Sequence, residues 1–185
     1  MALVLIKEDG TGRPDANSYA DVADADAYHE AHLYAAAWKA ASAANKEMAL
    51  VMATRLIDSS YQFNGFRSVD GQSLQWPRRK CPDPDHDDTF AHPLALDSGR
   101  YLASNQVPRA VVDATCEMAR ELLIGDRTAA PAGEGIASTW TSTQGIRYSK
   151  TDPRPVICRL AQSMLSKYGT LLNKTGRAVR LIPVR

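Results

Sequence analysis

Apolar residues recur at helical spacing in four stretches of the chain. These stretches run from Ser18 to about Tyr34, from after Asn45 to Tyr61, from Pro108 to Gly125 and from Pro155 to Tyr168. Ser18 is followed three positions later by Asp21, which is typical of a capping box at a helix start. Proline at the start of the third and fourth stretches and glycine after the third are also typical of helix ends. The pattern therefore predicts four principal helices.

The second and third helices differ in how their apolar residues are arranged. The second is apolar over most of its circumference, with Leu50 and Ile57 on one face and Met52 beside it. Such a helix packs between several partners, either inside a bundle or between subunits. The third helix has one apolar face and one charged face, and the charged face includes Glu117 and Arg120.

Helical spacing disappears between the second and third helices, from about residue 62 to about residue 106. A loop of this length inside a compact domain is uncommon and indicates a functional or interaction segment. Its most distinctive part is QSLQWPRR, residues 72–79, in which Trp76 is expected to fill the core under the loop, a role compatible with anchoring a contact between subunits. The candidates for a subunit interface are Gln72, Leu74, Trp76, Pro77 and Arg78.

Two β-rich runs predict a hairpin at about residues 136–149, because Thr143, Gln144 and Gly145 form a turn between them. The last segment, about residues 175–185, is basic and apolar. We expect it to pair as an extended arm with a sheet edge of its own or another chain. With 185 residues, the chain is long enough for one domain. We therefore predict one mainly α-helical domain with an inserted β-hairpin and extended N- and C-terminal arms.

The net charge of +1 conceals an uneven distribution of charge along the chain. Residues 1–125 carry 12 basic and 18 acidic side chains, whereas residues 147–185 carry 9 and 1. The basic end fits an anionic partner, or copies of the chain that meet front to back through opposite charges. Nucleic acid is one such partner, because Tyr148 and Tyr168 add candidate stacking surfaces to the cations. Solvated charges are the alternative interpretation.

Motifs for catalysis or cofactor binding are sparse. Neither a P-loop nor a dinucleotide-binding glycine motif occurs, and His29 and His32 lack a third metal ligand. Residues 81–92 hold one cysteine, four aspartates and two histidines, but Asp88 and Leu94 stand where a calcium loop needs glycine and glutamate. We therefore expect a solvated acidic loop, no cofactor and no enzymatic activity. The apolar runs also fall short of a membrane span, so no membrane partner is expected.

The order of several motifs resembles a known family. SYADVADADAY occupies residues 18–28, Trp38 follows, YQFNG occupies residues 61–65, QSLQWPR occupies residues 72–78, and Val107-Pro108 precedes the third helix. This order resembles the tailed-phage head-to-tail connector (adaptor, head-completion) proteins, whose relatives are labelled DnaT-like single-stranded-DNA-binding proteins. The resemblance covers about residues 17–172 and departs from the family in residues 81–88 and beyond Lys174.

The resemblance implies a four-helix adaptor-like bundle that assembles with copies of itself into a ring, commonly a dodecamer. Such a ring lies in the virion neck between the portal protein and the tail or tail-completion protein, and it is assembled in the host cytoplasm. It seals the packaged head and lines the exit channel, where it contacts passing double-stranded DNA non-specifically. No cofactor is implied. On this hypothesis the candidates for portal contact are Arg177, Arg180, Leu181, Ile182 and Arg185.

Two other functions stay open at this point. The DnaT-like label suggests a single-stranded-DNA-binding replication protein. A steep loss of oligonucleotide binding with added salt would favour it, because cation–phosphate contacts release counterions. A metal hydrolase built on residues 81–92 would instead purify with stoichiometric metal.

Overall fold

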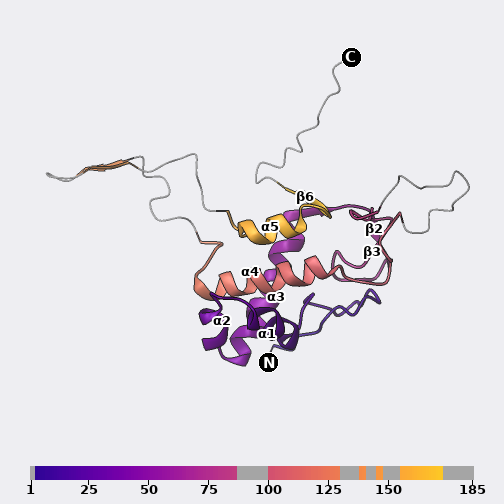
Figure 1. The fold of residues 1–185 in the computed structure, drawn as a ribbon, viewed down its shortest axis with the longest axis horizontal. Helices are drawn as coiled ribbons and strands as arrows, with labels where there is room; N and C mark the ends of the chain where they lie inside the picture. Colours follow the sequence, from indigo (N-terminus) through magenta and orange to yellow (C-terminus); the bar gives the residue numbers. More distant parts are fainter. Residues whose placement is uncertain (1–2, 87–99, 130–137, 141–144, 148–154, 173–185) are drawn as a thin grey trace, which may run out of the picture.

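Helix α4 (Arg109–Ile124) runs through the middle of the fold (Figure 1). The computed structural model describes residues 3–86, 100–129, 138–140, 145–147 and 155–172. Every residue from Ala114 to Arg120 is buried, so α4 has neighbours on all sides. It packs against α1 (Val22–Glu30), α2 (Ala36–Ala40), α3 (Ala43–Ser60) and α5 (Arg159–Leu165). Figure 1 shows α5 on one side of α4, with α1 and α2 on the other.

The predicted charged face of α4 lies partly inside the fold. Glu117 and Arg120 are buried, and Arg120 Nη2 donates to Glu117 Oε1 at 2.6 Å. Arg120 Nη1 also donates to the carbonyl oxygen of Tyr34, which lies in the connection between α1 and α2. The two charges are therefore compensated within the chain, as burial of a charged pair requires.

Helix α1 begins one turn later than predicted and ends at Glu30. Its N-cap is Asp21, which accepts a hydrogen bond from the Asp24 N–H at 2.8 Å, while the Asp24 carboxylate accepts one from the Asp21 N–H at 3.0 Å. Ser18 is buried and donates its hydroxyl to the Ala20 carbonyl at 2.7 Å instead. A capping box is therefore present, but it is formed by the two aspartates.

Helix α3 extends the predicted second helix toward the N-terminus, where Ser42 is the N-cap. Leu50 and Ile57 are fully buried against the core. Met48 and Met52, by contrast, are 51% and 37% exposed. The wide apolar face of this helix is thus only partly covered by the described part of the chain.

Two short antiparallel pairings occupy the start of the predicted long loop. Strand β1 (Tyr61–Phe63) pairs with β6 (Gly169–Leu171), and β2 (Phe66–Arg67) pairs with β3 (Arg78–Arg79). The prediction of a loop is wrong here, because strands of two or three residues are too short to show an alternating pattern. We refer to β2 and β3 as the β2–β3 ribbon.

The predicted hairpin is confirmed, since β4 (Ser138–Trp140) pairs antiparallel with β5 (Gly145–Arg147). Helix α5 is shorter than the predicted fourth helix. The predicted C-terminal arm, about residues 175–185, lies outside the described residues.

Among the helices that the structure describes, none combines the length and the apolar composition needed to cross a membrane. The fold is thus helical with small antiparallel sheets.

A glycine loop folds back the predicted N-terminal arm. Glu8 is buried, and its carboxylate accepts hydrogen bonds from the N–H groups of Gly10, Gly12 and Arg13, each at 2.9 Å. Both glycines have positive φ, which only glycine adopts at little cost. Backbone N–H groups arranged in this way bind anions, and here they bind the chain's own carboxylate.

Candidate nucleic-acid interface

All five residues predicted as a subunit interface are buried inside the chain. Trp76 lies edge-on to Phe63 and Tyr168, with ring centroids 5.6 and 6.1 Å away. The Gln72 side-chain amide donates to the Leu74 carbonyl oxygen at 2.8 Å. The interpretation of Trp76 as a core residue is therefore confirmed, and the interface role of the segment stays a prediction.

Arg78 ties strand β3 to the turn before β2. Its guanidinium donates to the carbonyl oxygens of Phe63, Asn64 and Gly65 at 3.2, 2.7 and 2.6 Å. It also donates to the Gln75 carbonyl and side-chain oxygens, both at 3.0 Å. Burial lowers the pKa of Arg78, although a guanidinium keeps its charge at any working pH. Arg78 is therefore buried and holds the main chain of these segments together through its guanidinium.

Gly65 allows the turn before β2 to approach the end of β3. Its φ is +72°, and a Cβ atom there would lie 2.5 Å from the Arg79 carbonyl oxygen and 2.7 Å from the Cys81 nitrogen. Both the backbone conformation and the lack of space therefore require glycine. The close approach fixes Phe66 beside Arg79.

A second anchor holds the segment leading into β3 onto α3. The Tyr19 hydroxyl donates to Asp58 Oδ1. The Gln75 N–H donates to the Tyr19 hydroxyl and to Asp58 Oδ2, both at 3.0 Å, and the Trp76 N–H donates to the Tyr19 hydroxyl at 3.2 Å. Burial raises the pKa of Asp58 to about 6, so this carboxyl titrates within the range in which most proteins are handled.

The outer face of the β2–β3 ribbon presents an exposed aromatic ring among cations. Phe66 is 63% exposed and lies directly opposite Arg79 in the register of the two strands. Directly opposite residues share one face of a strand pair, with Cβ atoms about 5 Å apart. Arg67 and Lys80 are exposed next to them in the chain. Within the described residues, Arg79 and Lys80 form no side-chain hydrogen bond or ion pair, and Phe66 makes no ring contact.

Lys80 has an unusual backbone conformation for a residue with a side chain. Its φ is 55°, in the left-handed region that costs such residues about 1 to 2 kcal/mol. Hydrogen bonds on both sides of Lys80 maintain this conformation. Arg78, two residues earlier, binds main-chain oxygens, and the Leu102 N–H donates to the carbonyl of the following residue, Cys81, at 2.9 Å. Conformations of this kind concentrate at functional sites.

The outer face of the ribbon has the chemistry needed to hold an unpaired nucleotide strand. An exposed ring stacks on the face of a base, and cations at its side pair with the phosphates. Bases inside a duplex are already stacked on one another, so a single ring on a ribbon does not reach their faces.

Other residues predicted to contact nucleic acid are placed differently. Tyr168 packs on Trp76, and burial raises its pKa. Lys167 lies 3.4 Å from Asp85 in an exposed ion pair, while Arg159 is exposed at the start of α5. Residues outside the described part of the chain are Tyr148 and the portal candidates Arg177, Arg180, Leu181, Ile182 and Arg185.

The predicted histidine candidates take structural roles. His29 is fully buried and its Nε2 donates to the Cys116 carbonyl at 3.1 Å, so it is a packing residue of the core. His32 Nε2 lies 3.5 Å from the Glu117 carboxylate. The acidic loop of residues 81–92 is described only as far as His86, and the described residues contain no cluster of three metal-ligating side chains.

Phe66 and Lys80 are functional candidates that the sequence analysis missed. They lie fourteen positions apart, and only the pairing of β2 with β3 brings them together. The signal available in the sequence was the run of three cations from Arg78 to Lys80. That run does not reveal that its first member is buried and the other two are exposed.

One family model matches the chain. The family is described as "Putative DnaT-like ssDNA binding protein", and the match covers residues 1–168. No curated protein and no solved structure gives a significant match to the chain. The description of the family names single-stranded DNA as its ligand.

The family match corrects the main functional prediction. The prediction of a connector ring between portal and tail is wrong, because the description of the matching family names single-stranded DNA binding, which was the alternative. The DnaT-like part of the resemblance is confirmed. Portal, tail and ring partners have no support from the comparison, and the location in the virion neck stays a prediction.

Proposed function

We propose that this chain, which belongs to the DnaT-like ssDNA binding protein family, binds single-stranded DNA through the outer face of the β2–β3 ribbon. One observation carries the assignment to this face. Phe66, an apolar ring 63% exposed to water, lies beside Arg79 and Lys80, which have no partner within the described residues. A stacked base would cover the ring, and phosphates would neutralise the two cations.

The proposed interface prefers single strands because of how its parts are arranged. Stacking on a protein ring is worth about 1 to 3 kcal/mol per base and is open to any base that is not already stacked. The cations beside the ring interact with phosphates of either form of DNA. Phe66 should therefore contribute to single-strand affinity, whereas Arg79 and Lys80 should contribute to both single-strand and duplex affinity.

The basic C-terminal region supports the same function through long-range attraction. Residues 147–185 carry 9 basic side chains and 1 acidic one. Strand β6 within this region pairs with β1, which ends at Phe63, three positions before Phe66. Concentrated positive charge raises the rate of encounter with DNA and makes binding sensitive to salt. We also propose that binding is the whole activity and that the chain is not an enzyme.

The test is a fluorescence anisotropy titration of a labelled oligothymidine of about 16 nucleotides, the upper end of common single-strand site sizes. Phe66→Ala should weaken binding by about 5- to 150-fold, which corresponds to the loss of one stacked base. The matched control is Tyr34→Ala. Tyr34 is 74% exposed and lies between α1 and α2, which Figure 1 shows at the other end of the fold from β2 and β3.

The control should leave the affinity unchanged, and so should Phe66→Ala when a duplex of the same length replaces the single strand. The proposal is contradicted if the two variants lose equal affinity, or if Phe66→Ala binds oligothymidine as the wild type does. Thermal unfolding of Phe66→Ala separates lost contact from lost fold, since an exposed ring contributes little to stability.

A further inference from the structure

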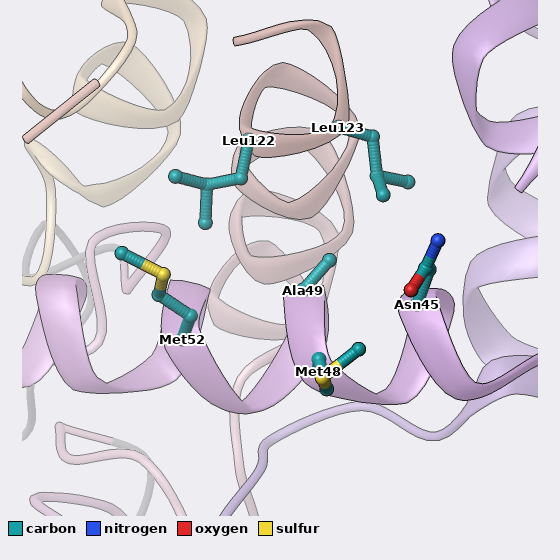
Figure 2. A pocket seen from close by; sticks show the side chains of 6 residues that line it. All are labelled: Asn45, Met48, Ala49, Met52, Leu122 and Leu123. Atoms are coloured by element: carbon teal, nitrogen blue, oxygen red, sulfur yellow. The ribbon is translucent and has the colours of Figure 1, made fainter. Parts of the chain in front are cut away.

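An apolar groove separates the first half of α3 from the end of α4. On α3 it is lined by one stripe at spacings of three, four and seven residues, and Leu122 and Leu123 of α4 face that stripe across the groove (Figure 2). The α3 residues of the stripe are Asn45, Met48, Ala49 and Met52. The volume of the groove is about 210 Å³.

The groove is open to solvent although its lining is almost wholly apolar. Met48 and Met52 keep 51% and 37% of their surface exposed, and Ile124 at the end of α4 is exposed as well. Contiguous exposed apolar surface of this kind marks a site that another segment or molecule covers. Methionine side chains adapt to partners of irregular shape, which suits an inserted chain segment.

The chain itself returns to the end of α3 before its last residues. Strand β6 is antiparallel to β1, which directly follows α3, so β6 runs back toward this helix. At the end of β6 the Leu172 N–H donates to the Ser60 carbonyl oxygen at 2.7 Å. The segment after Leu172 therefore starts at the C-terminal end of α3.

The length and composition of that segment match the groove. Residues 173–185 can span about 43 Å when extended, at about 3.3 Å per residue. The distance along α3 from Ser60 back to Asn45 is about 22 Å, at about 1.5 Å per residue. The segment carries four large apolar residues in its second half: Val179, Leu181, Ile182 and Val184. They lie at a distance along the chain that allows them to reach Met52 and Met48.

We propose that residues 173–185 run back along α3 and insert Val179, Leu181 and Ile182 into the groove of their own chain. A tethered segment of this length is present at an effective concentration on the order of millimolar, well above that of a free second copy at ordinary concentrations. Occupation from within the same chain is therefore favoured. The contact covers Met48 and Met52 and holds the intervening arginines beside the helical body, which goes beyond the proposed DNA interface.

The experiment uses the full-length chain with a nitroxide spin label on Arg185→Cys, beyond the inserted residues. The three native cysteines are buried, so the label attaches to the introduced thiol. Carbon-13-labelled methionine methyl groups are then observed by NMR, with the reduced nitroxide as reference. The methyl signals of Met48 and Met52 should broaden most, and the buried Met118 serves as the internal comparison.

Two further samples decide who occupies the groove. Broadening should not depend on protein concentration, and it should disappear in the variant Leu181→Asp, Ile182→Asp, in which charge opposes insertion. Spin-labelled chains mixed with separate isotope-labelled chains should show no broadening, whereas broadening there would assign the groove to a second copy and overturn the proposal. Equal signals in the oxidised and reduced full-length chain would overturn it too. Neither readout involves DNA, so failure here is distinct from failure of the DNA interface.

Discussion

The β2–β3 ribbon and the α3–α4 groove both leave apolar side chains in water, but they differ in the charge around them. On the ribbon, Phe66 stands beside exposed cations that have no partner in the described chain. In the groove, Met48 and Met52 face two leucines, with a single amide as the polar lining residue. Exposed apolar surface alone therefore does not identify a partner. The cations beside Phe66 favour an anionic polymer on the ribbon, whereas the uncharged lining of the groove favours an apolar segment.

The two regions also differ in how they are held. The ribbon is fixed by hydrogen bonds from the buried Arg78 and from the pair of Tyr19 and Asp58. The groove is lined by methionine side chains with several rotatable bonds. A ribbon held in place by its main chain suits stacking on a flat base, because little backbone freedom is lost on binding. An adaptable lining suits a chain segment of irregular shape.

Removing the Arg78 side chain should have the largest effect and should separate the two regions most clearly. Arg78→Ala leaves the carbonyl oxygens of three successive residues without their donor, so it should lower the free energy of unfolding by at least about 3 kcal/mol. Met52→Ala in the groove should cost less, under about 2 kcal/mol, because it leaves no hydrogen-bonding group without a partner and the described residues cover only part of this side chain. Urea unfolding measures both. Equal losses would show that the ribbon does not depend on Arg78.

The second anchor should make the stability of the fold depend on pH. Burial raises the pKa of Asp58 from 3.8 to about 6 in the folded chain, so between these values the folded chain holds a proton that the unfolded chain has lost. The stability that Asp58 contributes is therefore greatest at the acid end and falls as the pH rises from about 4 to about 6.

Asp58→Asn should abolish this fall. Relative to wild type, the variant should gain stability on the order of 3 kcal/mol across that interval, as measured by urea unfolding at each pH. The methyl signals of Met48 and Met52 should not titrate over the same interval. If the free energies of unfolding of wild type and variant differ by the same amount at every pH, Asp58 does not titrate with a raised pKa in the folded chain.

Substitution of Lys80 should have a smaller effect than the changes above, and it should alter DNA binding more than the stability of the fold. Lys80→Gly relieves a left-handed backbone while raising the entropy of the unfolded chain, so the free energy of unfolding should stay within about 1 kcal/mol of wild type. The loss of one phosphate contact should lower the slope of log affinity against log salt by about 0.7. Lys39→Ala, at an exposed lysine of α2, is the control and should leave the slope unchanged. An unaltered slope in Lys80→Gly would remove this residue from the interface.

Local patterns in the sequence predict part of this fold and miss the part that forms the candidate site. Helix α4 and the β4–β5 hairpin follow from periodicity, proline and glycine signals within a few residues. The β2–β3 ribbon does not, because its two residue pairs join positions 13 and 11 residues apart, and the turn at Gly65 and the hydrogen bonds of Arg78 that bring them together are tertiary contacts.

The sequence also does not show which of two similar nearby residues is buried or caps a helix. Arg78 and Arg79 are alike in the sequence, yet one is buried among carbonyl oxygens and the other is exposed beside Phe66. Ser18 and Asp21 are both residue types that cap helices well. Asp21 caps α1 because the Asp24 carboxylate accepts a hydrogen bond from the Asp21 N–H in return. Each choice is decided by which acceptor or donor the folded chain brings within reach.

The most direct test of the DNA interface is photochemical cross-linking of the wild-type chain to an oligothymidine that carries 5-iodouracil, a base that couples to aromatic rings stacked on it. Fragment mass spectrometry then locates the modified residue. We predict that the cross-link falls on Phe66 and that added unlabelled oligothymidine competes it away. Cross-links confined to Tyr34 or to any other residue away from β2 and β3 would show that the ribbon is not the DNA interface.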